Sequence, residues 1–247
     1  AHIYCVEQSL SNTDVLYAGT ATAGLWRSND KGENWFCLSK SLPISDVYSL
    51  EIDPYNENII YFSGGGTLYK SSNGGSSFTN IGSGEFNSGI EIKEIMIHNG
   101  KLWVASNQGL YYSSNSGNSF SQKMSGKWLE MEVHPTNNLV IYAIKENTNT
   151  TAFYKSTNNG SSFTEYSNGW PSPNSGDEQK RTEIAVSAAS PNKVVALCTG
   201  VANGGSGLYG IYISEDQGVN WEFKCCGAQP GGPASTLNIN MMGWQDD

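Results

Sequence analysis

The stretch Ser28-Asn29-Asp30-Lys31-Gly32-Glu33-Asn34-Trp35 recurs along the chain as Ser-x-(Asp/Asn)-x-Gly-x-x-(Trp/Phe), a motif we call the box. Further copies begin at Ser71, Ser113, Ser156 and Ser214, so that successive boxes lie 43, 42, 43 and 58 residues apart. This spacing predicts a chain of structural repeats. The longer last interval indicates an insertion in the fifth repeat, shared between residues 168–178 and 201–207.

Each box has the composition of a tight turn between two strands. The Asp or Asn side chain can accept hydrogen bonds from backbone N–H groups a few residues later. The Gly permits a positive φ, the Ser hydroxyl adds a local hydrogen bond, and the aromatic residue anchors the returning strand. We therefore interpret the following box residues as structural: Ser28, Asp30, Gly32, Trp35, Ser71, Asn73, Gly75, Phe78, Ser113, Asn115, Gly117, Phe120, Ser156, Asn158, Gly160, Phe163, Ser214, Asp216, Gly218 and Trp221.

Short apolar segments precede every box in the same order. In the second repeat, an alternating segment at 47–52 is followed by a strand-like run at 59–63 and then by Leu68-Tyr69. Each repeat is therefore predicted to be a meander of four short strands, with the box at the turn between the third and fourth.

One four-stranded sheet of this size cannot bury both of its faces, whereas sheets stacked around an axis can. We therefore predict an all-β fold, a single β-propeller over residues 1–247 built of four-stranded antiparallel blades. Five complete blades are expected at about 1–39, 45–82, 90–124, 127–167 and 181–226. Residues 236–247 are expected to start a further blade. They either close the ring or, as we favour, belong to a larger propeller from which this chain is cut.

The composition excludes several classes of function. A net charge of −9 with only two arginines, Arg27 and Arg181, argues against nucleic-acid binding. No apolar run is long enough to insert into a membrane. The five cysteines and the scattered histidines show no metal-ligand spacing, and no motif calls for a cofactor. The chain starts at Ala1 without a signal segment, so we expect a mature or excised piece.

Over nearly its whole length the chain resembles the Asp-box (bacterial neuraminidase, BNR) repeat propellers. The segments 17–28 and 50–61 resemble the sortilin-like and xyloglucanase-like branch, and secreted bacterial surface proteins carry similar sequence. The resemblance implies an extracellular or cell-surface location. It implies no single activity, because sialidases, xyloglucanase-type glycosidases, sortilin-type receptors and photosystem assembly factors all use this repeat.

The residues argue against catalysis by this chain alone. A sialidase of this kind holds its substrate carboxylate with three arginines, and two are present. The resemblance to xyloglucanases implies a catalytic Asp at the position of Ala21, and a second one in another propeller. Glu130 and Glu132 share one face of a predicted inner strand, and a pair lining the central channel is an alternative. We assign no catalytic residue.

The favoured function is a secreted or surface-exposed binding module, part of a larger multidomain protein, with a glycan or protein ligand at the central face. Trp170, beside two prolines in the insertion, is the candidate aromatic platform for a sugar ring, and Trp128 is the second candidate. The alternative for both is packing between sheets. Two other functions stay open: a glycoside hydrolase of the xyloglucanase-like type completed by residues outside this chain, and a structural or assembly-factor propeller.

Overall fold

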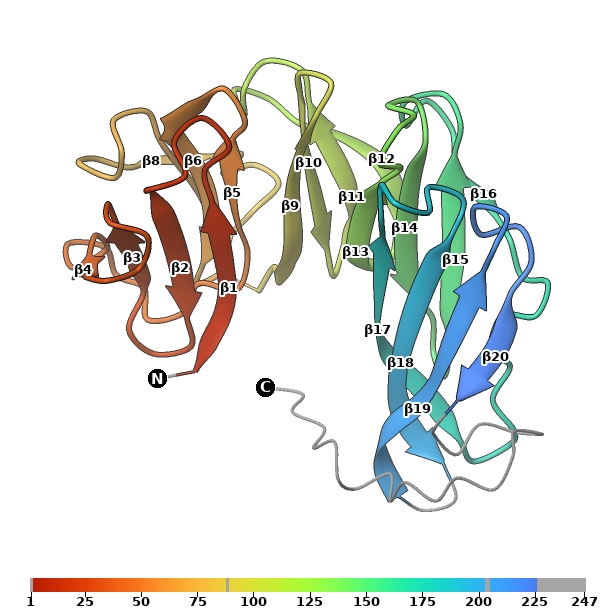
Figure 1. Cartoon of the computed structure of the whole chain (residues 1–247). Coiled ribbons are helices and arrows are strands. Elements are labelled where there is room, and N and C mark those ends of the chain that lie inside the picture. Colours follow the sequence, from red (N-terminus) through yellow and green to blue (C-terminus); the bar gives the residue numbers. More distant parts are fainter. Residues whose placement is uncertain (1, 88, 203–204, 226–247) are drawn as a thin grey trace. The chain divides into compact units, whose positions relative to one another are not determined.

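The computed structural model describes residues 2–87, 89–202 and 205–225, and these form five four-stranded antiparallel sheets (Figure 1). In every sheet the strands lie side by side in sequence order. The described residues contain no helix, and so none that could cross a membrane. The prediction of an all-β fold with five four-stranded propeller blades is confirmed. The predicted start of a further blade, 236–247, lies outside the described residues.

The strands have the following bounds. The first sheet contains β1 (Ile3–Gln8), β2 (Leu16–Thr20), β3 (Leu25–Ser28) and β4 (Phe36–Cys37). The second contains β5 (Leu50–Asp53), β6 (Asn56–Gly64), β7 (Thr67–Ser71) and β8 (Thr79–Ile81). The third contains β9 (Ile92–His98), β10 (Lys101–Ser106), β11 (Gly109–Ser113) and β12 (Ser121–Ser125). The fourth contains β13 (Lys127–Val133), β14 (Ile141–Glu146), β15 (Thr151–Ser156) and β16 (Thr164–Glu165). The fifth contains β17 (Glu178–Val186), β18 (Val194–Ala202), β19 (Gly205–Ser214) and β20 (Glu222–Cys225).

The insertion in the fifth repeat lengthens this last sheet. Strand β17 starts at Glu178, before the expected position 181, because Glu178 and Gln179 pair with Val201 and Gly200 of the long β18–β19 hairpin. The rest of the insertion, including Trp170, forms the connection from β16 to β17.

The chain divides into two compact units, residues 1–125 with the first three sheets and residues 126–247 with the last two. Within each unit, the first strands of consecutive sheets contact each other: β1 with β5, β5 with β9, and β13 with β17. Apolar side chains fill the space between the sheets. The cluster between the first and second sheets is Val15, Tyr17, Leu25, Val47, Leu50, Ile52, Ile60, Phe62 and Tyr69. Tyr61, Leu68 and Leu102 belong to the cluster between the second and third sheets, and Tyr142, Phe153 and Val194 to that between the fourth and fifth.

All five boxes form the same turn between the third and fourth strands of their sheets. The Asp or Asn Oδ1 accepts a hydrogen bond from the Ser hydroxyl at 2.7–3.0 Å and from the backbone N–H four residues later at 2.8–3.0 Å. The box Gly donates its own N–H to the Ser Oγ at 2.8–2.9 Å. The residue before the Gly also has a positive φ in every box. It is not a glycine in four of the boxes, as with Lys31 (60°) and Gln217 (62°), so the sequence did not predict this conformation.

The box Gly also sets how closely the preceding sheet can approach. A Cβ at Gly75 would overlap the side chain of Leu38, and one at Gly117 would overlap Ile81. In the second unit, a Cβ at Gly218 would overlap the ring of Phe153. All five box Gly residues have a left-handed φ, between 74° and 91°, and Gly75, Gly117 and Gly218 are also required for contact between sheets.

Substitution of a box Gly should destabilise the protein strongly. We expect Gly117→Ala to lower the free energy of unfolding by about 2–5 kcal/mol, because it combines a strained φ with overpacking against Ile81. Urea denaturation would measure the loss. Gly84→Ala is the matched control, since nothing lies within 4 Å of its added Cβ. Equal stability of the two variants would contradict this role.

Candidate binding face

One end of the first unit gathers the turns that lie opposite the boxes. The β2–β3 turn is tied to the start of β1 by a hydrogen bond from Ala21 N–H to the His2 carbonyl at 2.9 Å. It is tied to the segment entering β5 by Gly24 N–H to the Ser45 carbonyl at 2.8 Å and Val47 N–H to the Thr20 carbonyl at 2.9 Å. Three segments distant in sequence are thus fixed beside each other by backbone hydrogen bonds.

Two tyrosines stack at this end. The rings of Tyr4 and Tyr48 lie 4.3 Å apart between centroids with an interplanar angle of 24°. Tyr48 is 41% exposed, and Tyr4 is half-buried. Tyr4 occupies an irregularity in the β1–β2 pairing, between the paired residues Ile3 and Cys5. Such an irregularity re-aims a side chain, and the sequence alone gave no signal for it.

The β2–β3 turn supplies no carboxylate at this end at the position where the resemblance to xyloglucanases implies a catalytic Asp. Ala21 lies in the β2–β3 turn and contributes only a methyl group. Asp46 accepts a hydrogen bond from Gly65 N–H at 3.4 Å, which ties the segment entering β5 to the β6–β7 turn. Among the described residues, no group of His, Cys, Asp and Glu side chains is arranged to hold a metal ion.

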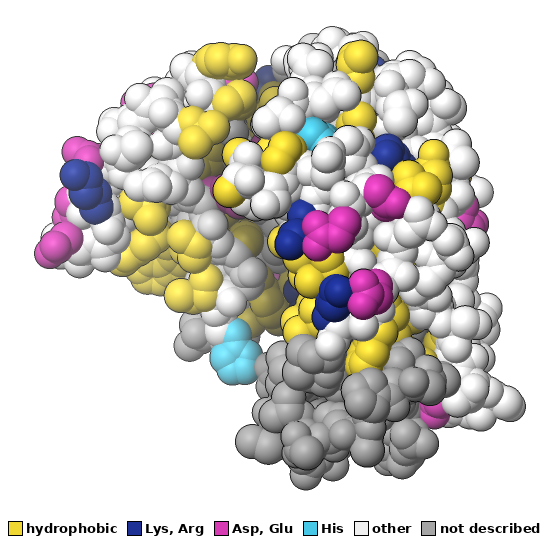
Figure 2. Space-filling model, turned by 45° about the vertical axis from the view of Figure 1, so that its right-hand side comes forward, with side chains coloured by type: hydrophobic (Ala, Val, Ile, Leu, Met, Phe, Trp, Pro, Cys, Tyr) yellow, Lys and Arg dark blue, Asp and Glu magenta, His cyan; other side chains and the backbone are white. Residues whose placement is uncertain are grey.

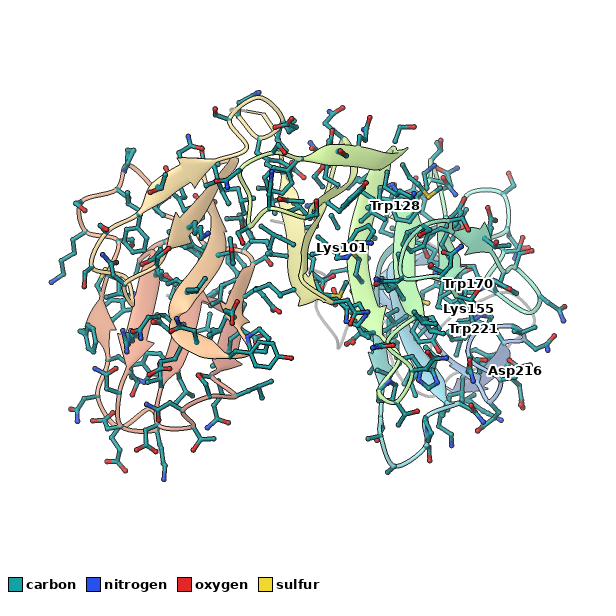
Figure 3. All side chains as sticks on the ribbon, turned by 90° about the horizontal axis from the view of Figure 1, so that it is seen from above. Lys101, Trp128, Lys155, Trp170, Asp216 and Trp221 are labelled. Atoms are coloured by element: carbon teal, nitrogen blue, oxygen red, sulfur yellow. The ribbon has the colours of Figure 1, made fainter. Side chains whose placement is uncertain are left out.

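The interpretation of Trp170 and Trp128 as exposed platforms is wrong. Trp128 is fully buried, with its ring 5.1 Å from that of Tyr154. Trp170 is 8% exposed and lies against Trp221, with the ring centroids 4.7 Å apart (Figure 3). Its Nε1–H donates to the Thr151 carbonyl at 2.8 Å. The prolines beside Trp170 suggested an exposed loop, whereas the insertion folds back and places the indole in the core between the fourth and fifth sheets.

A buried polar network supports this core and was missed by the sequence analysis. Gln179 is fully buried, and its Oε1 accepts hydrogen bonds from Thr151 N–H at 3.1 Å and from the Thr150 hydroxyl at 3.0 Å. Its Nε2 donates to Thr182 and to the Cys198 sulfur. Burial raises the pKa of Cys198 to about 12, so this thiol stays protonated and unreactive at neutral pH.

Glu130 connects two sheets and is not one of a solvent-facing pair. It is 8% exposed, and its Oε2 accepts a hydrogen bond from Ile184 N–H at 2.6 Å, joining β13 to β17. Glu51 does the same for Ile97 N–H at 3.0 Å, joining β5 to β9. Glu132, two residues from Glu130, is half-buried. The alternative of a Glu130–Glu132 pair lining a channel therefore has no support from Glu130.

The side chains of Asp53 and His134 close the turns in which they lie. Asp53 Oδ1 accepts Tyr55 N–H at 2.9 Å, and His134 Nδ1 accepts Thr136 N–H at 3.2 Å and Asn137 N–H at 3.1 Å. His134 is buried. Burial, and next the positive charge of Lys155, lower the pKa of His134 below its ordinary value.

A family model for the DUF6242 beta propeller domain matches residues 54–180, just over half of the chain. The chain belongs to this family. No curated protein matches the sequence. The description of the family as a beta propeller domain agrees with the five four-stranded sheets of this chain.

Three solved structures illustrate the similarity in fold. The GH74 xyloglucanase from Xanthomonas campestris is 16% identical with a TM-score of 0.66, over 88% of this chain and 38% of that one. The extracellular domain of a putative hybrid two-component system from B. thetaiotaomicron is 13% identical with a TM-score of 0.63, over 90% and 27%. YCF48 from Cyanidioschyzon merolae is 10% identical with a TM-score of 0.57, over 91% and 85%. The DUF6242 chain thus spans about a third of the GH74 structures, and at these identities the likeness concerns the fold alone.

Loss of Trp170 should reduce stability. We expect Trp170→Ala to lower the free energy of unfolding by about 3–5 kcal/mol, because it removes a buried indole and leaves a cavity. Tyr55→Ala, at a side chain that is 91% exposed, should change stability by less than about 0.5 kcal/mol. Chemical denaturation would measure both. A Trp170→Ala protein as stable as the wild type would contradict the buried position.

The pKa of His134 predicts a pH dependence of stability. Because the pKa is lower in the folded state, the unfolded state binds a proton first as the pH falls. The free energy of unfolding should therefore decrease as the pH falls through about 6.5, the unfolded value. His134→Asn keeps an acceptor for the turn and removes the titration. Urea midpoints at about pH 7.5 and about pH 5.5 would measure the difference, and identical pH dependence in the two proteins would contradict this assignment.

Proposed function

We propose that this chain is a secreted or surface-exposed Asp-box propeller module that binds a carbohydrate or protein ligand. The observation that carries the proposal is the exposed Tyr48, stacked on the half-buried Tyr4 at the end of the first unit opposite the boxes. Tyrosine combines a large apolar ring with a polar hydroxyl, and it is enriched at recognition sites for that reason. The apolar C–H face of a sugar ring or an apolar peptide side chain can pack on such a ring.

The support around the tyrosines favours binding. Tyr48 follows Val47, which is fully buried and hydrogen-bonded to Thr20. The segment is therefore held before a ligand arrives, so that less conformational entropy is lost on binding. Charged residues make up only 15% of the chain, and the face drawn in Figure 2 has exposed hydrophobic side chains beside charged ones.

The likeness in fold to GH74 enzymes supports one alternative, a glycoside hydrolase completed outside this chain. Inverting glycoside hydrolysis needs two carboxyl groups about 6.5–9.5 Å apart across the substrate. Ala21 supplies no carboxyl group, and the carboxylate of Glu130 is buried and accepts a hydrogen bond from a backbone N–H. Neither of these two positions therefore supplies a catalytic carboxyl group.

The first sheet supports the proposal that the module belongs to a larger protein. Its box residue Trp35 is 36% exposed, whereas Trp221 at the same position of the fifth sheet is 6% exposed. Ile3 and Val6 on β1 are 63% and 49% exposed, although Leu50, at the position in β5 that corresponds to Val6, is buried under the first sheet. Exposed apolar residues on one sheet are consistent with further polypeptide packing there.

Binding through the tyrosine stack can be tested with a panel of polysaccharides and glycans. We expect at least one to bind, and Tyr48→Ala to weaken that binding about ten-fold by removing the stacking surface. Tyr55→Ala is the control, because Tyr55 is exposed but lies in the β5–β6 turn at the box end. Calorimetry would give the affinities.

Three results would overturn parts of the proposal. If no glycan binds, the carbohydrate class is excluded. Equal affinity in Tyr48→Ala and wild type would place the site elsewhere. Release of reducing ends above a heat-inactivated control would favour the hydrolase.

A further inference from the structure

The two faces of the first sheet differ in exposure. On one face, Tyr17 and Leu25 are buried in the cluster shared with the second sheet (Figure 1). Because successive side chains of a strand point to opposite faces, Leu16 and Trp26 lie on the other face, where both are half-buried. Val6 of β1 lies in register with Trp26 across β2 and is 49% exposed. We call this side the outer face of the first sheet, made of Val6, Leu16, Trp26 and the box residue Trp35.

Residues at the same positions in three other sheets are packed against the preceding sheet. Val6 lies opposite Ala18, which lies opposite Trp26, and these sheets repeat this pairing between their first, second and third strands. The outer face is thus built like three surfaces that each receive a neighbouring sheet. The corresponding residues are Leu50, Ile60, Tyr69 and Phe78 in the second sheet, Ile95, Leu102, Tyr111 and Phe120 in the third, and Ile184, Val194, Tyr212 and Trp221 in the fifth.

The glycine of the first box differs from three other box glycines in what lies beside it. In those three, a side chain of the preceding sheet occupies the position of an added Cβ: Leu38 at Gly75, Ile81 at Gly117 and Phe153 at Gly218. At Gly32, the atoms nearest to an added Cβ belong to Trp35 of the same box, at 3.7 Å. Gly32 has the same left-handed φ, 91°, so its turn is already formed. A Leu, Ile or Phe side chain of another sheet can therefore pack here.

The first box also has the carbonyl group that accepts a cation in two other boxes. Arg27 Nη1 donates to the Gly74 carbonyl at 2.8 Å, and Lys70 Nζ donates to the Ser116 carbonyl at 3.2 Å. Both acceptors belong to the residue before the box Gly, and in the first box that residue is Lys31. A neighbouring sheet with a basic residue before its own box Ser would reach this carbonyl.

The innermost strand of the first sheet has a matching backbone donor. Ser49 Oγ accepts Ile95 N–H at 2.9 Å, and Glu130 Oε2 accepts Ile184 N–H at 2.6 Å. In both pairs, the oxygen comes from the preceding sheet. Val6 has the same register position as Ile95 and Ile184. Its N–H would therefore donate to a Ser or Glu oxygen on the first strand of a docking sheet.

A second copy of the chain, docking by its fifth sheet, would not satisfy these groups. The first and second sheets, which provide such contacts, carry Tyr17 and Tyr61 on the second strand, with a basic residue opposite on the third. Val195 and Ile213 hold these two positions in the fifth sheet. That sheet therefore offers no cation to the Lys31 carbonyl.

We propose that the outer face of the first sheet is a docking surface for a further four-stranded box sheet, from a part of the same polypeptide outside this chain. The inference rests on the proposed function as a module of a larger protein and adds which kind of part packs here. The docking sheet places an apolar side chain at Gly32, a basic one at the Lys31 carbonyl and an oxygen at Val6 N–H. This chain spans about a third of the GH74 structures, so a larger protein of similar fold would contain further sheets.

Photo-crosslinking in the full-length polypeptide that contains this chain identifies what packs on the outer face. With Val6→p-benzoylphenylalanine, we expect a cross-link to a segment outside residues 1–247 that carries a box. The same amino acid at Tyr55, which is 91% exposed in the β5–β6 turn, is the control and should not cross-link to that segment. A cross-link to a segment without a box, or to a second copy of residues 1–247, would overturn the proposal.

Oxidative footprinting of the unsubstituted proteins covers the case in which the bulky probe prevents docking. Trp35 should be oxidised about six-fold more slowly in the full-length polypeptide than in this chain, in proportion to the exposed fractions of Trp35 (36%) and Trp221 (6%). Tyr48 should react equally in both. Equal oxidation of Trp35 would overturn the proposal, as would protection that appears in this chain alone as its concentration rises. Glycan binding is measured separately through Tyr48→Ala, so failure of the binding function and failure of docking give different results.

Discussion

The box turn packed against the preceding sheet is the constraint on which the rest of the structure depends. Each four-stranded sheet has two faces to bury, and it does so only if its neighbours approach within van der Waals distance. At Gly75, Gly117 and Gly218 the neighbouring side chain occupies the space that a Cβ would take. The eight-residue box turn thus determines how closely neighbouring sheets, of roughly forty residues each, can pack.

Around this packing, polar side chains connect consecutive sheets at specific backbone groups. Glu51 and Glu130 accept N–H groups from the first strand of the next sheet, and Arg27 and Lys70 donate to carbonyls of the next box. Glu130 is buried, and a buried carboxylate is retained only where it is satisfied. These four side chains hold neighbouring sheets in place within each unit. Their structural role explains ionisable residues that could otherwise be mistaken for catalytic ones.

Function is then left to the groups that packing does not use. The turns opposite the boxes are joined by backbone hydrogen bonds, and beside them the exposed Tyr48 stacks on Tyr4 of β1. A rigid scaffold that positions a few exposed aromatic side chains is a common arrangement for recognition. Trp128 and Trp170, with their larger apolar surface, are buried and contribute to the packing of the second unit.

The sequence by itself determined the repeat, the four-strand meander and the box turn, because these depend on contacts between residues close along the chain. Asp30 and Asn34, or Ser71 and Gly75, meet within one turn. Which aromatic residues are exposed was decided only by the tertiary structure. Trp170 is buried by Phe153 and Trp221, each 17 or more residues away, and Tyr4 meets Tyr48 across two sheets. Local patterns carry no information about such distant partners, so the candidate site moved from the tryptophans to the tyrosines.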